Sequence, residues 1–227
     1  MRGLFVTFEG VDGCGKSTQV ARLAQSLEAQ GYPVLCLREP GGTPLSEKIR
    51  SLLLDPANGD MVPEAELLLY EASRAQLVRQ VIRPALAAGQ VVLCDRFYDS
   101  TTAYQQAGRG LDARMVSEAN RLGSCGLAPD VTLWLKLDPA QGLARATGAH
   151  SPDRLEQEGV AFQEAVATGC EALAAKEPQR VAAIDASGTP EQVETAIYQV
   201  VSQALEVCGL RAAVAADSAH SRGAAGD

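Results

Sequence analysis

Short apolar runs rich in β-branched and aromatic residues recur along the chain, separated by longer segments with helical periodicity. The runs do not alternate polar with apolar residues, which is typical of strands buried on both faces of a parallel sheet. They occupy residues 4–8, 33–37, 91–95, 131–137 and 180–185.

The intervening segments have the spacing of amphipathic helices. In the first of them Val20, Leu23 and Leu27 lie on one face, and Gly31 has the position of a helix C-cap. Pro84 lies inside the second, where we expect a kink because proline donates no backbone hydrogen bond. Strands that alternate with helices predict a doubly wound α/β fold. The predicted helices span residues 16–31, 63–89, 153–176 and 189–207.

No linker or internal repeat interrupts this pattern, so we expect one domain over residues 1–210. Residues 211–227 are small or polar and lack periodicity. We therefore expect this segment to be a disordered tail.

The composition excludes several classes of protein. The net charge of −8 argues against a nucleic-acid partner, which requires a basic surface. There is no apolar run of about 18 residues and no signal-peptide pattern, so we expect neither a membrane span nor export. The six cysteines form no C-x-x-C pair and no zinc spacing, and we interpret them as small buried hydrophobic residues. These features predict a cytoplasmic protein.

The sequence GVDGCGKST follows the first predicted strand and opens the first predicted helix. Its glycines allow successive backbone N–H groups to point at phosphate oxygens, and the helix N-terminus adds a positive end. Lys16 supplies a positive charge for the β- and γ-phosphates, and the Ser17 hydroxyl is a Mg²⁺ ligand. The pattern predicts a nucleotide-binding loop. Its residues are Gly10, Val11, Asp12, Gly13, Cys14, Gly15, Lys16, Ser17 and Thr18.

Asp95 ends the third apolar run, where the second acidic group of a nucleotide site is expected. Because the carboxyl ends of parallel strands converge on one crevice, Asp95 should share a site with this loop and with Arg38 and Glu39. Asp95 is then a Mg²⁺ ligand together with Ser17. Taken alone, it could equally be a helix N-cap.

The distribution of arginines favours a kinase over a GTPase. No Asn-Lys-x-Asp guanine-recognition motif occurs in the chain. Arg38, Arg50, Arg74 and Arg96 stand where they can face the same crevice, which predicts a second phosphate-bearing ligand. Each of them taken singly is also compatible with a solvated surface charge.

Several longer stretches resemble the bacterial thymidylate kinases over about residues 3–207. They are FEGVDGCGKST, REPGGTPLSEKIR, ELLLYEASRAQ, DRFYDSTTAYQ and DRLEQE, in this order. The resemblance implies a P-loop NTPase fold of the nucleoside monophosphate kinase type: a three-layer α/β sandwich with a five-stranded parallel sheet. It also implies a lid at about residues 142–156, a homodimer, and transfer of the γ-phosphoryl group of ATP, with Mg²⁺, to dTMP in dTTP biosynthesis.

The resemblance also implies roles in binding dTMP. Arg96 should hold the dTMP phosphate with help from Arg50. Tyr70, in place of the usual phenylalanine, should stack on thymine, and its hydroxyl then needs a partner. Arg74 should bond the carbonyl edge of the base.

Further residues are expected around the base and sugar. Thr101 and Gln105 should lie near the base, and Tyr104 against the deoxyribose. Asp12 and Glu39 should organise the sugar 3′-hydroxyl and the hydrated Mg²⁺. The catalytic residues that the resemblance implies are Lys16, Asp12, Asp95, Arg96, Arg145 and Arg154.

The lid departs from the family pattern. Family members carry a catalytic arginine either in the phosphate-binding loop or in the lid, and Gly13 at the loop position indicates the lid class. Arg145 and Arg154 match the outer lid arginines, but His150 stands at the middle position. Outside the lid, Ser46 stands where the family usually has glycine.

Two other functions stay open on the sequence alone. A deoxynucleoside kinase shares the loop and the Asp-Arg motif, but acts on a neutral acceptor and needs a carboxylate base at the 5′-hydroxyl. A lid that has a histidine at one of its arginine positions is also compatible with a nucleotide-binding module that has lost catalysis.

Overall fold

The computed structural model describes residues 2–148 and 152–212. In this part of the chain, five parallel strands form one sheet in the order β2-β3-β1-β4-β5. The strands are β1 (Phe5–Glu9), β2 (Val34–Arg38), β3 (Val91–Asp95), β4 (Val131–Lys136) and β5 (Val181–Asp185). The predicted five-stranded parallel sheet is confirmed, and the strand bounds differ from the predicted ones by one residue at most.

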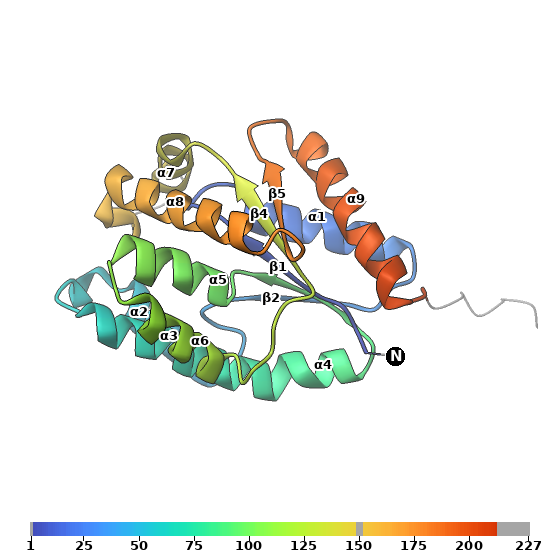
Figure 1. The fold of residues 1–227 in the computed structure, drawn as a ribbon, viewed down its shortest axis with the longest axis horizontal. Coiled ribbons are helices and arrows are strands. Elements are labelled where there is room, and N and C mark those ends of the chain that lie inside the picture. Colours follow the sequence, from blue (N-terminus) through green and yellow to red (C-terminus); the bar gives the residue numbers. More distant parts are fainter. Residues whose placement is uncertain (1, 149–151, 213–227) are drawn as a thin grey trace, which may run out of the picture.

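Helices cover both faces of the sheet and connect its strands (Figure 1). The α-helices are α1 (Lys16–Ala29), α2 (Pro44–Leu54), α3 (Pro63–Leu77), α4 (Arg83–Ala87), α5 (Tyr98–Thr101), α6 (Ala113–Gly123), α7 (Pro139–Thr147), α8 (Val160–Lys176) and α9 (Pro190–Cys208). Two π-helical segments, η2 (Val78–Ile82) and η3 (Thr102–Gly108), and two 3₁₀ turns, η1 (Pro56–Asn58) and η4 (Glu156–Glu158), complete the described elements.

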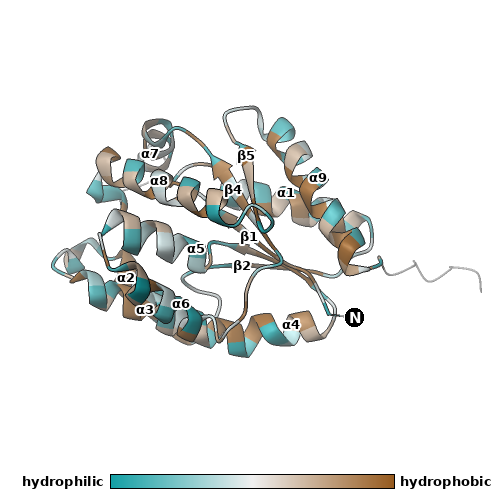
Figure 2. Ribbon diagram, viewed as in Figure 1, coloured by the Kyte–Doolittle hydropathy of each residue, from teal (hydrophilic) through white to brown (hydrophobic). Residues whose placement is uncertain are grey.

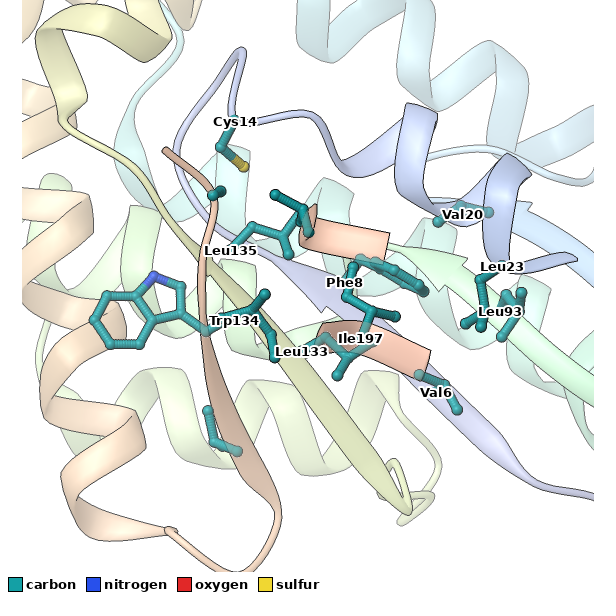
Figure 3. Packing of buried hydrophobic residues seen from close by; sticks show 14 of the residues in the cluster. Val6, Phe8, Cys14, Val20, Leu23, Leu93, Leu133, Trp134, Leu135 and Ile197 are labelled. Atoms are coloured by element: carbon teal, nitrogen blue, oxygen red, sulfur yellow. The ribbon is translucent and has the colours of Figure 1, made fainter. Parts of the chain in front are cut away.

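The period of two along β1 directs its side chains into two apolar layers. Val6 and Phe8 join the layer that includes Leu23 of α1 and Ile197 of α9 (Figure 3). Phe5 joins the other layer, which η2 and α4 cover. Figure 2 shows the strands mainly in the hydrophobic colour, whereas the helices carry both the hydrophobic and the hydrophilic colour. The predicted three-layer architecture is therefore confirmed.

The two edge strands correct the expectation that every strand is buried on both faces. β2 and β5 lie at the two ends of the sheet and are only partly buried. For the same reason the thiol of Cys36, on β2, is exposed, and Cys208 near the end of α9 is exposed as well. The expectation of buried cysteines holds for Cys14, Cys94 and Cys170.

Two predicted helices differ from those observed. The helix predicted over 63–89 consists of α3, η2 and α4: the N–H of Arg83 bonds to the carbonyl of Val78, and this wider turn precedes Pro84. The helix predicted from residue 153 begins only at Val160, because Gly159 has a φ of 83° that no helix allows.

The C-terminal part of the fold ends with α9. Gly209 closes this helix in the left-handed conformation, and Leu210 packs back onto the core. Except for Arg211 and Ala212, the predicted tail lies outside the described residues. No helix of the described residues is both long and apolar enough to cross a bilayer.

Candidate active site

The loop between β1 and α1 has the conformation of a phosphate cradle. Gly10, Gly13 and Gly15 have φ values of 136°, 69° and 98°, which L side chains rarely adopt. No side chain caps the first turn of α1, so its N–H groups remain available to an anion. The buried Lys16 ammonium donates to the carbonyl oxygens of Val11 (2.9 Å) and Gly10 (3.2 Å). The chain therefore holds this charge at the loop before any ligand binds.

Ser17 and Asp95 lie together at the end of this loop. The Ser17 hydroxyl donates to Asp95 Oδ2 at 2.5 Å, which brings the two predicted metal ligands into contact. Among the described residues, no cluster of three or more His, Cys, Asp or Glu side chains could hold a metal. A hydroxyl and a single carboxylate suit Mg²⁺, which keeps several waters and takes its other ligands from phosphates. The donor set thus fits the predicted ion.

Arg96 links the phosphate-binding loop to the segment after β3. Its φ of 69° is rare for a residue with a side chain and turns the guanidinium back toward the loop. Nη2 donates to Asp12 Oδ1 (2.5 Å) and to the Tyr104 hydroxyl (3.0 Å). Nη1 donates to the Gly10 carbonyl (3.0 Å) and to Ser100 Oγ (3.1 Å).

Asp12 is held from two sides. While Oδ1 accepts from Arg96, Oδ2 accepts from Gln163 Nε2 of α8 at 2.7 Å. Burial opposes ionisation of Asp12, but the charges of Arg96 and Lys16 outweigh it and lower the pKa of the carboxyl. Asp12 is thus an ionised partner of Arg96. Gln163 has no sequence signal that sets it apart from other polar residues of α8.

Glu9, the last residue of β1, binds the segment that follows β3. Its Oε1 accepts the backbone N–H of Phe97 at 2.8 Å, and its Oε2 accepts from the Ser100 hydroxyl. Burial raises the pKa of Glu9 to about 8, and repulsion from Asp99 adds to the rise. Sequence reasoning missed Glu9, because the last residue of an apolar strand gives no sign of such contacts.

Arg74 lies at the opposite end of the site, held by two carboxylates. Its Nε donates to Glu39 Oε2 at 2.7 Å, its Nη1 to Glu71, and its Nη2 to Thr101 Oγ1 at 3.0 Å. Burial raises the pKa of Glu39 to about 7; Arg74 opposes the rise and Glu71 adds to it. Burial also raises the pKa of Glu71.

A cavity of about 270 Å³ lies at the carboxyl edge of the sheet. Most of the residues predicted for the site line it. They are Asp12, Gly13, Lys16, Ser17, Arg38, Glu39, Arg50, Tyr70, Arg74, Asp95, Arg96, Thr101, Tyr104 and Gln105. The remaining lining residues were not predicted singly: Pro40, Leu54, Phe97 and Ser100, and Asp153, Leu155 and Glu156, which fall within the segment predicted as a lid.

Arg50 and Tyr70 approach the cavity from α2 and α3. Arg50 Nη1 donates to the Pro40 carbonyl at 3.1 Å. Tyr70 is half-buried, and burial raises the pKa of its hydroxyl. Within the described residues this hydroxyl makes no hydrogen bond, so it stays available to a ligand or to water.

Neither of the two arginines of the predicted lid lines the cavity. Arg145 is exposed on α7. Arg154 is buried: its Nε donates to the Leu53 carbonyl at 2.8 Å, and its Nη2 lies 2.5 Å from Glu66 Oε2. The latter is an ion pair without hydrogen-bond geometry. His150 lies outside the described residues.

Helix α7, which overlaps the predicted lid segment, touches the phosphate-binding loop directly. A Cβ at Gly13 would lie 2.0 Å from the Gly142 carbonyl oxygen, so the backbones are in contact there. This explains why Gly13 carries no side chain. Ser46, the other departure from the family pattern, has an ordinary helical conformation in α2, and its hydroxyl donates to the Ser73 carbonyl at 3.0 Å.

Comparison with known proteins points to one family. The family model described as thymidylate kinase matches residues 8–197. A thymidylate kinase of Synechococcus sp. (strain JA-2-3B'a(2-13)) is 53% identical over 203 residues, which cover 89% of this chain and 96% of that protein. The thymidylate kinase of Trichlorobacter lovleyi is 49% identical over 90% of this chain and 99% of its own length.

A solved structure gives the same result. The thymidylate kinase from Ehrlichia chaffeensis superposes with a TM-score of 0.74 at 32% sequence identity, covering 88% of this chain and all of that one. The chain therefore belongs to the thymidylate kinase family.

Proposed function

We propose that the protein transfers the γ-phosphoryl group of ATP to dTMP, giving ADP and dTDP. The observation that carries this proposal is the convergence of a phosphate-binding loop and four arginines on one cavity: Arg38, Arg50, Arg74 and Arg96. The positive groups of the phosphate-binding loop suit the donor phosphates, and the arginines suit an anionic acceptor. Membership of the thymidylate kinase family supports dTMP as that acceptor.

Catalysis in this site rests on positioning and on charge. The acceptor is already an anionic phosphate, so no strong general base is needed. Lys16 holds the donor phosphates, and Arg96, fixed by Asp12 and Tyr104, holds the acceptor phosphate in line with them. Arg50 adds positive charge on the acceptor side. The same logic disfavours a deoxynucleoside kinase, whose neutral acceptor does not need two arginines.

The end of the cavity around Arg74 suits a pyrimidine. Tyr70 offers an aromatic face for stacking, and Thr101 and Gln105 lie on the adjoining wall. Arg74 offers N–H donors to a base carbonyl. Tyr104 and Glu39 then border the sugar.

Ser17 and Asp95 are the residues that would hold Mg²⁺ beside the ATP phosphates. When bound, the ion neutralises charge on the phosphates during transfer. The catalytic roles of Arg145 and Arg154 stay predictions. Such a role for Arg154 requires that its ion pair with Glu66 breaks.

A row of exposed apolar side chains supports the proposed homodimer. Helices α2, α3 and α6 lie side by side (Figure 1). Each presents large hydrophobic residues to solvent, and exposed apolar residues gathered on neighbouring helices are typical of an interface. These residues are Leu45, Leu52, Leu68, Met115 and Leu122. We propose a cytoplasmic homodimer without a nucleic-acid partner, in keeping with the net charge of −8.

The direct test is formation of dTDP from ATP, Mg²⁺ and dTMP, measured by chromatography. Lys16→Ala is the matched inactive control. The proposal expects dTDP from the unchanged protein and at most a trace from the variant. Measurable ATP binding without dTDP would support the non-catalytic binding module instead.

A further inference from the structure

Glu71 is a buried acidic residue next to the active site that the reaction, as described so far, does not use. It lies on α3, three residues before Arg74, and does not line the cavity. Its Oε1 accepts from Arg74 Nη1, so any effect on a ligand has to pass through Arg74.

Charge balance does not account for Glu71. Glu39 already pairs with the Arg74 guanidinium at 2.7 Å, and one carboxylate suffices to neutralise it. A second buried carboxylate costs desolvation free energy that this ion pair does not need. The raised pKa of both carboxyls reflects that cost. The cost indicates that Glu71 has a geometric role.

The geometric effect of Glu71 is to complete the fixation of Arg74. Glu39 holds Nε, Glu71 holds Nη1, Thr101 holds Nη2, and the Phe97 ring lies 5.3 Å from Cζ. Each Nη carries a second N–H group, and within the described residues these two donors have no partner. They are the donors that Arg74 can offer in the cavity.

Helix α6 is shaped to admit this carboxylate. A Cβ at Gly123 would lie 1.8 Å from Glu71 Oε2 and 2.9 Å from Glu71 Cβ, so the Glu71 side chain would have to shift. Gly123 has no left-handed φ, so its backbone conformation does not require glycine. A helical glycine is unfavourable relative to alanine by about 0.5–1 kcal/mol. What this position does require is space for Glu71.

We propose that Glu71 is a positioning residue that sets base specificity: it fixes the Arg74 guanidinium so that its two remaining N–H groups meet a pyrimidine carbonyl. Thymine presents a carbonyl where cytosine presents an amino group. Fixed N–H donors form hydrogen bonds with the thymine carbonyl and repel the cytosine amino group. A mobile guanidinium turns away from the amino group at little cost, so it discriminates less between the two bases. This inference rests on the proposed function and deepens it.

The test measures kcat/KM for dTMP and for dCMP in the full-length protein. We expect Glu71→Ala to lower the dTMP:dCMP ratio by about tenfold, because a charge-assisted hydrogen bond no longer holds Arg74. Glu71→Gln keeps an acceptor oxygen and should restore most of the ratio. Glu64→Gln, at an exposed acid of the same helix, is the matched control and should leave the ratio unchanged.

A second variant separates this role from simple stability. Gly123→Ala keeps the Glu71 charge but pushes its carboxylate aside, so it should lower the ratio as Glu71→Ala does. In a protein that already carries Glu71→Ala, the Gly123→Ala substitution should not change the dTMP:dCMP ratio further. Loss of stability alone would lower both activities together.

The outcomes separate this inference from the proposed function. A dTMP preference that stays within about twofold of the unchanged protein in both Glu71→Ala and Gly123→Ala overturns the inference and leaves the function intact. If the unchanged protein itself shows no preference for dTMP, the proposed function fails, and the inference fails with it.

Discussion

Replacement of Glu66 by glutamine tests the ion-pair cluster that holds the lid segment. Glu66 is fully buried on α3, accepts hydrogen bonds from Gln105 and Arg109, and forms an ion pair with Arg154. Arg109 Nη2 donates at 3.0 Å and Gln105 Nε2 at 2.8 Å, while Arg154 Nη2 lies 2.5 Å away. Glutamine has nearly the same shape, so the substitution removes mainly the charge.

We expect Glu66→Gln to lose much of the free energy of unfolding. Removing one partner of a buried ion pair costs about 3–5 kcal/mol, because the other charge stays buried without compensation. Arg154 is 5% exposed, and among the described residues its guanidinium then keeps only the Leu53 carbonyl as a hydrogen-bond partner. Arg109 keeps its ion pair with Glu158. We therefore expect the free energy of unfolding to fall by about 3 kcal/mol, and Tm to fall by about 10 °C. Urea unfolding followed by circular dichroism measures this change.

The difference in stability between the unchanged protein and Glu66→Gln should depend on pH in a defined direction. Burial would raise the pKa of Glu66, but the hydrogen bonds from Arg109 and Gln105 and the charge of Arg154 lower it. The stabilisation is therefore fully present above the unfolded-state pKa of about 4.3 and is lost as the pH falls through the lower folded-state value. The difference between the two proteins should shrink in acid.

Glu118→Gln is the control, because Glu118 pairs with Arg114 on an exposed helix face. We expect a change of about 0.3 kcal/mol there. A loss below about 1 kcal/mol for Glu66→Gln at pH 7 would refute the reasoning. Arg154→Ala should destabilise similarly; an unchanged Tm with a strongly reduced kcat would instead show that Arg154 acts at the phosphates.

Three further predictions concern other parts of the molecule. Lys16→Ala should lower kcat at least about 100-fold without changing Tm, since it removes a charge at the transferred group; steady-state kinetics and thermal unfolding check this. Glu9→Gln should gain stability relative to the unchanged protein as the pH rises from about 4.5 to about 8, because the raised pKa of Glu9 makes its ionisation costly in the folded state; urea titrations across that range measure it. Leu68→Glu should convert the dimer into monomers in sedimentation velocity, since it places a charge in the exposed apolar row of α3; unchanged sedimentation would argue against that interface.

The sequence predicted those parts of the structure that depend on local pattern. The strand-loop-helix context of residues 10–18 identified the phosphate-binding loop, because glycine spacing, lysine and hydroxyl all serve the same anion. Asp95 and Arg96 followed from their place at the end of an apolar strand. Both features depend on residues adjacent in the chain.

The parts that were missed depend on contacts between distant residues. Nothing in the sequence around Glu66 or Glu71 shows that α3 buries these carboxylates against arginines. The catalytic role of Arg154 stays a prediction, but the sequence did not indicate its ion pair with Glu66, 88 positions earlier in the chain. The start of α8 was misplaced because hydrophobic periodicity continues across Gly159, whereas its backbone conformation does not allow a helix.

One measurement tests the central claim most directly: ADP release from ATP and Mg²⁺ with dTMP, dUMP, dCMP, GMP and thymidine as separate acceptors. The account predicts the highest kcat/KM with dTMP, because Arg96 and Arg50 suit an acceptor phosphate and Arg74 a base carbonyl. Turnover with thymidine but not with dTMP would contradict it, since the site would then act on a neutral 5′-hydroxyl.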